Sequence, residues 1–511
     1  MSSRKPNLSP LLNRVSEILV QQKCKAYVVG GFVRDWILGR EIKDIDVSVD
    51  GDVLHLAEIL ANQLAARYIV LDENNRIGRI TSFPHDPLLQ LDVSGYTQNI
   101  EHDLVKRDFT IDAMAIDLQE FIEGSLCIID PYNGQDDLEA CLIRAVRDDI
   151  FDLDPLRLLR AVRLAGELSF TIEQRTERLI KENVHSIITV AGERVRDELL
   201  RLLALHNFNI WLRYMDELGL LLAIIPELGA MKGVEQPKEH YWDVYAHSVE
   251  TVAAVEFIIH KAKWVYGDSA LLTYVPWSDE IKQHMDEEVS GGSQRTHMLK
   301  IGALLHDIAK PAVKSFDDDG RMRFIGHTKQ GALIAASLLN RLRFSGREID
   351  LVAKLVYHHL RPVQMSTGGL PSGKAIYRFF RDAGDDGIDI VMLALADFLA
   401  TQGPRLNIDE WKHQNELMKF ILDEKQNQES KLKPVKLIDG HEVMGLFNLT
   451  PGPLVGKLLS LVHEAQALGE VSSKEEAIAL IRRELEGEDC NGYECASSMP
   501  VDNKAIIHFL E

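Results

Sequence analysis

Short apolar runs with alternating positions fill the first part of the chain. Residues of turn-forming type separate them, and they read AYVVGG, DIDVSV, ARYIVLD, GRITSF, LLQLDVS and DAMAIDL. A period of two in a run rich in β-branched residues is typical of strands that bury one face. Beyond DPLRLLRAVRLAGEL the apolar spacing changes to three and four, which predicts helices almost without strands. We therefore expect an α+β fold, in which a mixed sheet with helices is followed by all-helical regions.

The change of pattern near residue 150 marks the first domain boundary. A second boundary is expected in the polar stretch GAMKGVEQPKEHYWDVYAHS, and KQNQESKLKPVK reads as a charged, helix-breaking linker before a last helical part. The stretch MDEEVSGGSQRTH predicts a flexible loop between two helices. A chain of 511 residues suits three or four domains. The predicted segments are 1–148, 149–230, 231–428 and 429–511, the last ending in a polar tail.

Composition narrows the classes of protein that fit. The chain is 46% hydrophobic and 26% charged, and it contains no apolar run long enough to span a membrane. The first residues lack the apolar stretch of a secretory signal, and five cysteines do not suggest a disulfide framework, so we expect a cytoplasmic protein. A net charge of −21 argues against nucleic-acid binding by the whole surface, but leaves room for local basic patches on the arginine-rich helical segments.

Two acidic residues occupy alternate positions of one predicted strand. Asp44 and Asp46 point to the same face, whereas Ile45 and Val47 point to the core. Two carboxylates this close repel each other unless a cation lies between them, which predicts a divalent metal site. Metal held by paired carboxylates serves in-line phosphoryl or nucleotidyl transfer.

Two glycines precede this strand. Gly30 and Gly31 follow one predicted strand and open a helix, so their backbone can approach a phosphate closely. A Gly-Gly pair alone indicates only a turn, but the pair joined to Asp44-x-Asp46 is a more specific pattern.

Several motifs in order resemble the class II tRNA nucleotidyltransferases, the bacterial CCA-adding and poly(A) polymerase group. The motifs are GGFVRD with DIDV, LVKRDFTIDAMA, DPYNGQDDLEACLIRAV, DLDPLRLLRAVR and ERVRDELLRLL. The resemblance covers most of the first 220 residues. It implies a nucleotidyltransferase head, then a helical neck that carries an amino-acid template for the incoming base.

The resemblance also assigns roles to residues. It implies that Asp44 and Asp46 hold Mg²⁺, that the tRNA 3′ hydroxyl attacks the α-phosphate of CTP or ATP, and that Asp92 completes the carboxylate cluster. The remaining residues that it places at the nucleotide are Gly30, Gly31, Arg34, Arg107, Asp108, Asp154, Arg157 and Arg160.

The template motif has a physical reason. A carboxylate and a guanidinium supply the acceptor and the donors needed to read the Watson–Crick edge of a base. Asp154 and Arg157 are spaced i and i+3, which places them on one helical face. Leu153 stands where the family usually has Glu, and Asp112 where it has Asn. The stretch between Asp92 and Asp108 is also short, a feature associated in the family with addition of CC only, so the terminal A stays open.

A second constellation follows the neck. His247, His306, Asp307 and Asp397 are spread over several predicted helices, and imidazole with carboxylate ligands suits Mn, Fe, Ni, Zn or Mg. The set resembles the primary ligands of the HD phosphohydrolase superfamily. The resemblance implies a metal-dependent phosphohydrolase, which relatives use on 2′-phosphorylated ends. Additional ligands are expected among His327, His358 and His359.

Alternatives remain at this point. A poly(A) polymerase shares the same catalytic head and extends many RNAs with ATP. An RNA-binding or nucleotide-sensing protein with a silent site is the other alternative, against which intact Asp44 and Asp46 argue. The last segment, with DGHEVMGL and PGPLVGKLL, resembles the helical part that grips tRNA in HD-containing relatives, or is a helical interaction module.

Overall fold

The computed structural model describes most of the 511 residues. The described ranges are 9–42, 44–73, 76–84, 89–125, 127–367, 369–431 and 437–488. The predicted polar tail after residue 488 lies outside them.

The chain divides into two compact units. The first consists of Met1–Ser269, Lys282–Tyr357 and Ala396–Leu406, and the second of Ala270–Ile281, His358–Leu395 and Asn407–Glu511. These units do not follow the four predicted segments, whose boundaries stay a prediction. No helix among the described residues is long and apolar enough to cross a membrane.

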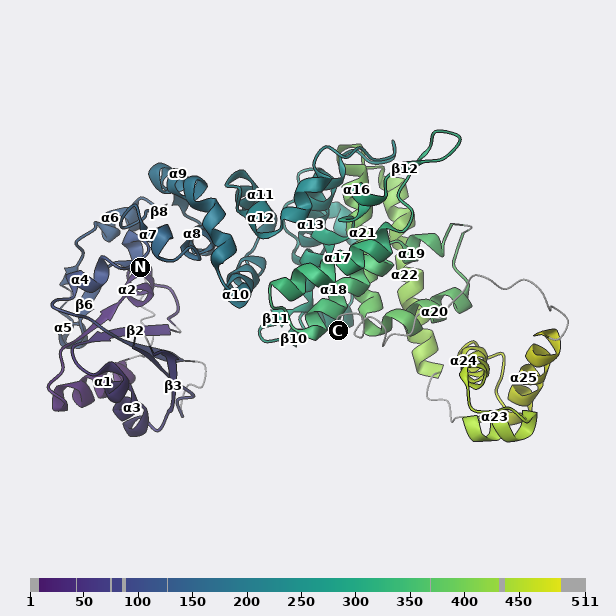
Figure 1. The fold of residues 1–511 in the computed structure, drawn as a ribbon, viewed down its shortest axis with the longest axis horizontal. Coiled ribbons are helices and arrows are strands. Elements are labelled where there is room, and N and C mark those ends of the chain that lie inside the picture. Colours follow the sequence, from purple (N-terminus) through teal and green to yellow (C-terminus); the bar gives the residue numbers. More distant parts are fainter. Residues whose placement is uncertain are drawn as a thin grey trace. The chain divides into compact units, whose positions relative to one another are not determined.

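A seven-stranded mixed sheet forms the N-terminal part of the first unit, drawn in purple and blue in Figure 1. The strand order is β3-β4-β5-β2-β1-β6-β7, and among these neighbours only β2 and β5 are parallel. The bounds are β1 Ala26–Val29, β2 Asp44–Val49, β3 Arg67–Asp72, β4 Ile77–Thr81, β5 Gln90–Gly95, β6 Ala115–Asp117 and β7 Ile128–Ile129. The six strands expected from the alternating pattern are therefore confirmed.

The alternation along β2 separates its two faces. Ile45 and Val47 are fully buried, whereas Asp44 is exposed and Asp46 partly exposed. Helices α1 (Ser9–Gln21) and α3 (Val53–Gln63) pack together, and α3 lies on β3, β4 and β5 (Figure 1). Helix α2 (Gly31–Leu38) connects β1 to β2. The apolar face of the sheet thus forms a core, and the acidic residues lie on the other face.

Helices follow from residue 150 onward, as predicted. They include α8 (Arg157–Leu168), α10 (Gly192–Leu203) and α11 (Phe208–Glu217). Arg163 on α8 and Glu198 on α10 are both buried, with Arg163 Nε 2.6 Å from Glu198 Oε2. A buried pair with good geometry fixes how two helices pack, because losing one partner leaves a charge without compensation.

The remaining helices of the first unit surround the histidines. Their bounds are α13 Val244–His260, α15 Arg295–Leu305, α16 Lys310–Val313 and α17 His327–Arg341, and two further helices, α18 Gly346–His358 and α21 Gly387–Gln402, run across the division between the units. Helices α13 and α15 pack along each other. The stretch expected as a flexible loop forms a hairpin instead, with β10 Glu288–Ser290 and β11 Ser293–Gln294, because Gly291 and Gly292 adopt positive φ and close a tight turn.

The second unit is helical. Its helices include α20 (Gly373–Ala383), α22 (Ile408–Lys431), α23 (Gly440–Phe447), α24 (Pro453–Ala467) and α25 (Lys474–Glu488). An apolar cluster that includes Val443, Leu458 and Ile481 holds the last three together. The charged linker was predicted to begin at Lys425, but α22 continues to Lys431, since charged and amide side chains are good helix formers. The rest of that linker lies outside the described residues.

Candidate functional site

A glycine turn lies at the end of β1. Gly30 has φ 68° and ψ −136° and precedes Gly31, the first residue of α2. A Cβ atom on Gly30 would lie 2.9 Å from Nη1 of Arg107 and 3.2 Å from Oδ2 of Asp46. Only glycine adopts this conformation readily and leaves room for both groups. The turn therefore brings backbone, a guanidinium and a carboxylate together.

Three carboxylates lie on one face of β2 and β5. Asp46 is the register partner of Asp92 on the parallel strand, and Asp44 is two residues before it. The net pKa of Asp46 is raised to about 6. Burial is the largest cause, Arg107 opposes it, and the neighbouring Asp92 carboxylate adds to it. A partly buried carboxylate beside another one is a site that a divalent cation stabilises, and the oxygen donors suit Mg²⁺.

Arg79, for which no role was predicted from the sequence, binds both carboxylate oxygens of Asp92. Nε and Nη2 of Arg79 donate to Oδ1 and Oδ2 of Asp92, each at 2.7 Å. Arg79 on β4 is the antiparallel register partner of Asp92. The signal was a cationic residue on the polar face of a predicted strand, but the register between β4 and β5 was needed to recognise the pair.

Asp112 is part of a buried ion-pair network. Its Oδ1 accepts from Nη1 of Arg34 at 2.7 Å, and its Oδ2 lies 3.8 Å from Nη2 of Arg160. Arg160 Nε also lies 2.5 Å from Oδ2 of the buried Asp108. Although burial raises it, Arg160 and Arg157 hold the pKa of Asp108 below its usual value. Asp112, the departure from the family's Asn, thus holds two arginines that the sequence placed at the nucleotide.

The two template residues are not on one helical face. Asp154 ends the short helix α7 (Ile150–Leu153) with extended backbone, φ −151° and ψ 100°, and Arg157 is the first residue of α8. The predicted shared helical face is therefore wrong. Pro155 is the reason, because helical conformation is disfavoured for the residue before a proline.

Both template residues are held by contacts. Arg194 donates to the two oxygens of Asp154 at 3.2 and 2.8 Å, and Nη2 of Arg157 donates to the carbonyl of Lys106 at 2.8 Å. Leu153, in the position of the family's Glu, is 59% exposed. Both side chains are therefore held in a fixed orientation by these contacts.

Replacing Gly30 by alanine is expected to reduce the nucleotide incorporation that the resemblance implies about 10-fold, because the new methyl group displaces Arg107 and Asp46. The change also costs stability of about 1–3 kcal/mol from the strained backbone. Incorporation of labelled nucleotide and thermal unfolding measure the two effects. Gly384→Ala is a matched control: Gly384 has φ 63° and ψ −145°, and no atom lies within 4 Å of its Cβ position. Equal loss of incorporation in both variants would contradict the crowding argument.

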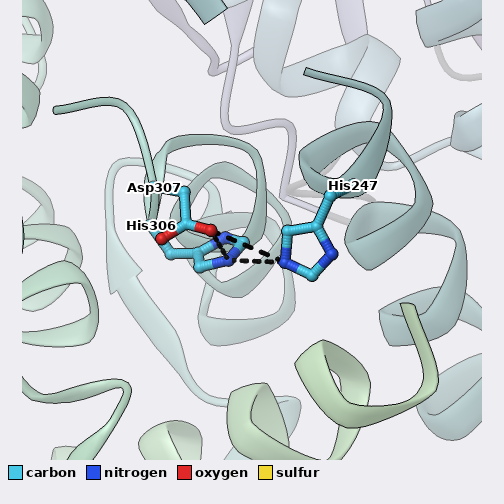
Figure 2. Close-up of side chains that lie close together, drawn as sticks. All are labelled: His247, His306 and Asp307. Atoms are coloured by element: carbon cyan, nitrogen blue, oxygen red, sulfur yellow. Dashed lines mark hydrogen bonds and ion pairs between the residues drawn. The ribbon is translucent and has the colours of Figure 1, made fainter. Parts of the chain in front are cut away.

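A second site gathers the predicted HD ligands. Figure 2 shows His247 from α13 opposite His306 and Asp307, which follow α15 directly. His306 Nε2 lies 3.1 Å from both His247 Nε2 and Asp307 Oδ2. Oδ1 of Asp397 on α21 lies 3.0 Å from His247 Nε2 and 3.8 Å from His306 Nε2. Ligands about 2.1 Å from one ion are about 3.4 Å apart in a tetrahedral arrangement, so the close group of His247, His306 and Asp307 fits a metal centre, and Asp397 is a further donor beside it.

The ionisable groups of the site bear on metal binding. Nδ1 of His306 lies 2.8 Å from the carbonyl of Ala303, which can only accept, so Nδ1 carries a proton and Nε2 is the ring nitrogen that faces His247 and Asp307. Burial lowers the pKa of His247. Burial raises the pKa of Asp307, but His306 and Lys310 lower it more, and the pKa lies well below its usual value. Burial lowers the pKa of His306, but the Asp307 carboxylate raises it and the net shift is upward, so a divalent metal would displace a proton from this imidazole.

The other histidines are placed differently. Nε2 of His327, at the start of α17, lies 3.5 Å from Oδ1 of Asp307. His358 ends α18, and the buried His359 follows it. Both belong to the second unit, and their role as ligands stays a prediction.

Sequence reasoning missed Lys310 and His240 at this site. Lys310 Nζ lies 2.6 Å from Asp307 Oδ2 and donates to Oε1 of Gln236 at 2.7 Å. The His240 ring meets His247 edge to face, with centroids 5.3 Å apart. Lys310 follows Asp307 by three residues, which was a usable signal, whereas the contact of His240 depends on the fold of a polar segment.

The comparisons with known proteins agree with both sites. Family models match a "Poly A polymerase head domain" over residues 26–144, a "Probable RNA and SrmB-binding site of polymerase A" over 169–231, and an "HD domain" over 278–401.

Two curated relatives span nearly the whole chain. An A-adding tRNA nucleotidyltransferase of Deinococcus radiodurans is 33% identical over 90% of this chain and 95% of its own length. A CC-adding tRNA nucleotidyltransferase of Thermus thermophilus is 30% identical over 89% and 93%. Among solved structures, the Thermotoga maritima CCA-adding enzyme complexed with tRNA has a TM-score of 0.59 and 22% identity, over 94% of this chain and 96% of that one, which shows a shared fold.

Proposed function

The chain belongs to the tRNA nucleotidyltransferase family, and on that premise we propose that it adds nucleotides from CTP or ATP to the 3′ end of tRNA. The observation that carries this proposal is the pair Asp44 and Asp46 on one face of β2, beside Asp92 and against the Gly30 turn. The names of the relatives support the substrates.

Each group of the head has a role in the proposed reaction. Asp44 and Asp46 would hold Mg²⁺, which supplies positive charge where the α-phosphate is attacked. The tRNA 3′ oxygen forms a bond to the α-phosphorus, and the bond to pyrophosphate breaks in line. Arg107, next to the Gly30 backbone, would neutralise phosphate charge, and Asp154 with Arg157 would read the base.

The nucleotide at which addition stops is the finer part of the proposal. The segment between Asp92 and Asp108 is short: the end of β5 and the one-turn helix α4 (Glu101–Leu104) lie in it. This short length favours addition that stops after CC. The relatives named above include both an A-adding and a CC-adding enzyme.

The test gives purified protein Mg²⁺ with CTP and ATP, separately and together. The substrates are tRNAs ending at the discriminator base, at C and at CC, and gels size the products. Addition that stops after CC supports the short-segment argument. A single A added to the CC end contradicts it but keeps tRNA nucleotidyl transfer. A long A tail would contradict tRNA-directed transfer and indicate a poly(A) polymerase.

For the second site we propose a metal-dependent phosphohydrolase. His247, His306, Asp307 and Asp397 would hold a divalent ion, whose charge favours attack of water on phosphorus. Phosphomonoesters and cyclic phosphates at the 2′ position of nucleotides are the proposed substrates. Absence of phosphate release from 2′ and cyclic nucleotides with each of Mg²⁺, Mn²⁺, Ni²⁺ and Co²⁺ would overturn this proposal.

A further inference from the structure

The segment after His240 is attached to the helix that carries Asp397. The backbone N–H of Tyr241 donates to the carbonyl of Thr401 at 3.0 Å. The hydroxyl of Thr401, one turn beyond Asp397 on α21, lies 3.5 Å from Oδ1 of Asp397. One residue earlier, the His240 ring contacts His247. Tyr241 is therefore linked to the proposed metal centre in two ways: it follows His240, which contacts His247, and it bonds to Thr401, which contacts Asp397.

The Tyr241 ring is exposed but held in place. It is 41% exposed and meets the Trp242 ring edge to face, with centroids 4.6 Å apart. Trp242 in turn lies against the backbone of Gly403, where a Cβ atom would be 2.9 Å from its Nε1. A rigid aromatic side chain at the surface loses little entropy when it binds a ligand, so its exposed area is available for recognition.

Arg405 covers this ring with its guanidinium, 4.9 Å from the ring centroid. Arg405 is itself exposed and belongs to the 3₁₀ turn Gly403–Arg405 that follows α21. Across the described parts of the chain, no carboxylate pairs with it. A guanidinium with one face on an aromatic ring keeps its other face and its N–H groups for a ligand, and this combination suits a base plane and phosphate oxygens.

We propose that Tyr241 and Arg405 form a nucleoside subsite of the phosphohydrolase site. A nucleobase stacks on the outer face of the Arg405 guanidinium, while the phosphate ester of the same nucleotide reaches the site of His247 and Asp397. The ligand class is a nucleotide with a 2′-phosphate, either free or at an RNA end. This inference rests on the proposed phosphohydrolase function.

The test compares two phosphomonoesters of secondary alcohols, one with a base and one without. Full-length protein with Mn²⁺ hydrolyses adenosine 2′-phosphate or glycerol 2-phosphate, and released phosphate is measured. Arg405→Met and Tyr241→Ala are each expected to raise the KM for adenosine 2′-phosphate about 10-fold, with kcat retained, because the first removes the guanidinium that stacks on the base and the second removes the ring that supports it. The KM for glycerol 2-phosphate stays within about twofold, as expected for an ester with no base to stack.

Tyr274→Ala is the matched control. Tyr274 is 40% exposed and has Lys412 over its ring, with Nζ 5.4 Å from the centroid, but it belongs to the second unit. It is expected to leave both KM values unchanged. Equal changes for the two esters in the Arg405 and Tyr241 variants, or no change for either, would overturn the subsite.

Binding without metal separates the subsite from the hydrolase. In EDTA, the Kd of adenosine 2′-phosphate is measured by equilibrium dialysis for wild type, Arg405→Met and Tyr274→Ala. A Kd raised about 10-fold only in Arg405→Met supports the subsite, even if wild type hydrolyses neither ester and the phosphohydrolase proposal fails. An unchanged Kd in Arg405→Met overturns it.

Discussion

Replacing Asp46 by asparagine is expected to reduce nucleotide incorporation by on the order of 10³-fold or more. The amide keeps the shape of the side chain but removes the charge that would hold Mg²⁺, and a metal at the reacting phosphate contributes several kcal/mol to the transition state. Asp46 is the carboxylate nearest the Gly30 turn and is adjacent to Asp92 in the sheet, so no other group replaces it. Incorporation of labelled CMP and AMP into tRNA measures the effect.

Two controls belong with this variant. Asp136→Asn makes the same substitution at an exposed position of α6 (Gly134–Glu139) and is expected to keep full incorporation. The phosphohydrolase activity of Asp46→Asn should equal that of wild type, which shows that the protein is folded. If Asp46→Asn retained a tenth of the wild-type incorporation at saturating Mg²⁺, Asp46 would not be a metal ligand.

The second large effect is expected for Asp397→Asn. Oδ1 of Asp397 lies 3.0 Å from Nε2 of His247, and replacing this ionised oxygen by a neutral amide removes one of the two carboxylates among the four proposed ligands. Although burial raises the pKa of Asp397, its hydrogen bond with His247 lowers it, so the carboxylate is ionised near neutral pH. Metal content by mass spectrometry should fall to background after dialysis, and phosphate release should fall on the order of 10²-fold or more.

Asp350→Asn is the control for this second site. Asp350 is 58% exposed on α18 and pairs with Lys354, four residues on. This variant should keep both metal and hydrolysis, and both variants should keep nucleotide incorporation. Retention of a full equivalent of metal by Asp397→Asn would remove Asp397 from the ligand set.

Local patterns predicted the elements and their faces well. The period of two in DIDVSV placed Asp44 and Asp46 on one face of a strand, and the structure confirms this because Ile45 and Val47 are fully buried. The histidines of the second site were identified because the whole set, taken in order along the chain, resembles the ligands of the HD superfamily, whereas each histidine alone indicates little. Their convergence needed the packing of α13 on α15, which no local pattern contains.

One wrong prediction could have been avoided from the local sequence, whereas two contacts could not be predicted because they depend on how the chain folds. The prediction that Asp154 and Arg157 share one helical face did not take account of Pro155. A proline disfavours helical conformation in the residue before it, and this effect was visible in the sequence. The ion pair of Arg79 with Asp92 was not readable, since it depends on the register between β4 and β5. The role of Asp112 likewise required its contacts with Arg34 and Arg160, which are far away in the chain.

The Asp112 network has a consequence for recombining parts of this family. Arg160 belongs to the neck helix α8, whereas Asp108 and Asp112 belong to the head, so the ion pairs cross the junction between them. A chimera that joined this head to the neck of a relative would leave the buried Asp108 and Asp112 facing residues other than Arg160. The opposite chimera would leave Arg160 without these two acids. Because Arg163 on α8 pairs with the buried Glu198 on α10, the unit that keeps all of these pairs is the head together with α8 and α10, and a crossover point placed after Leu203 preserves them.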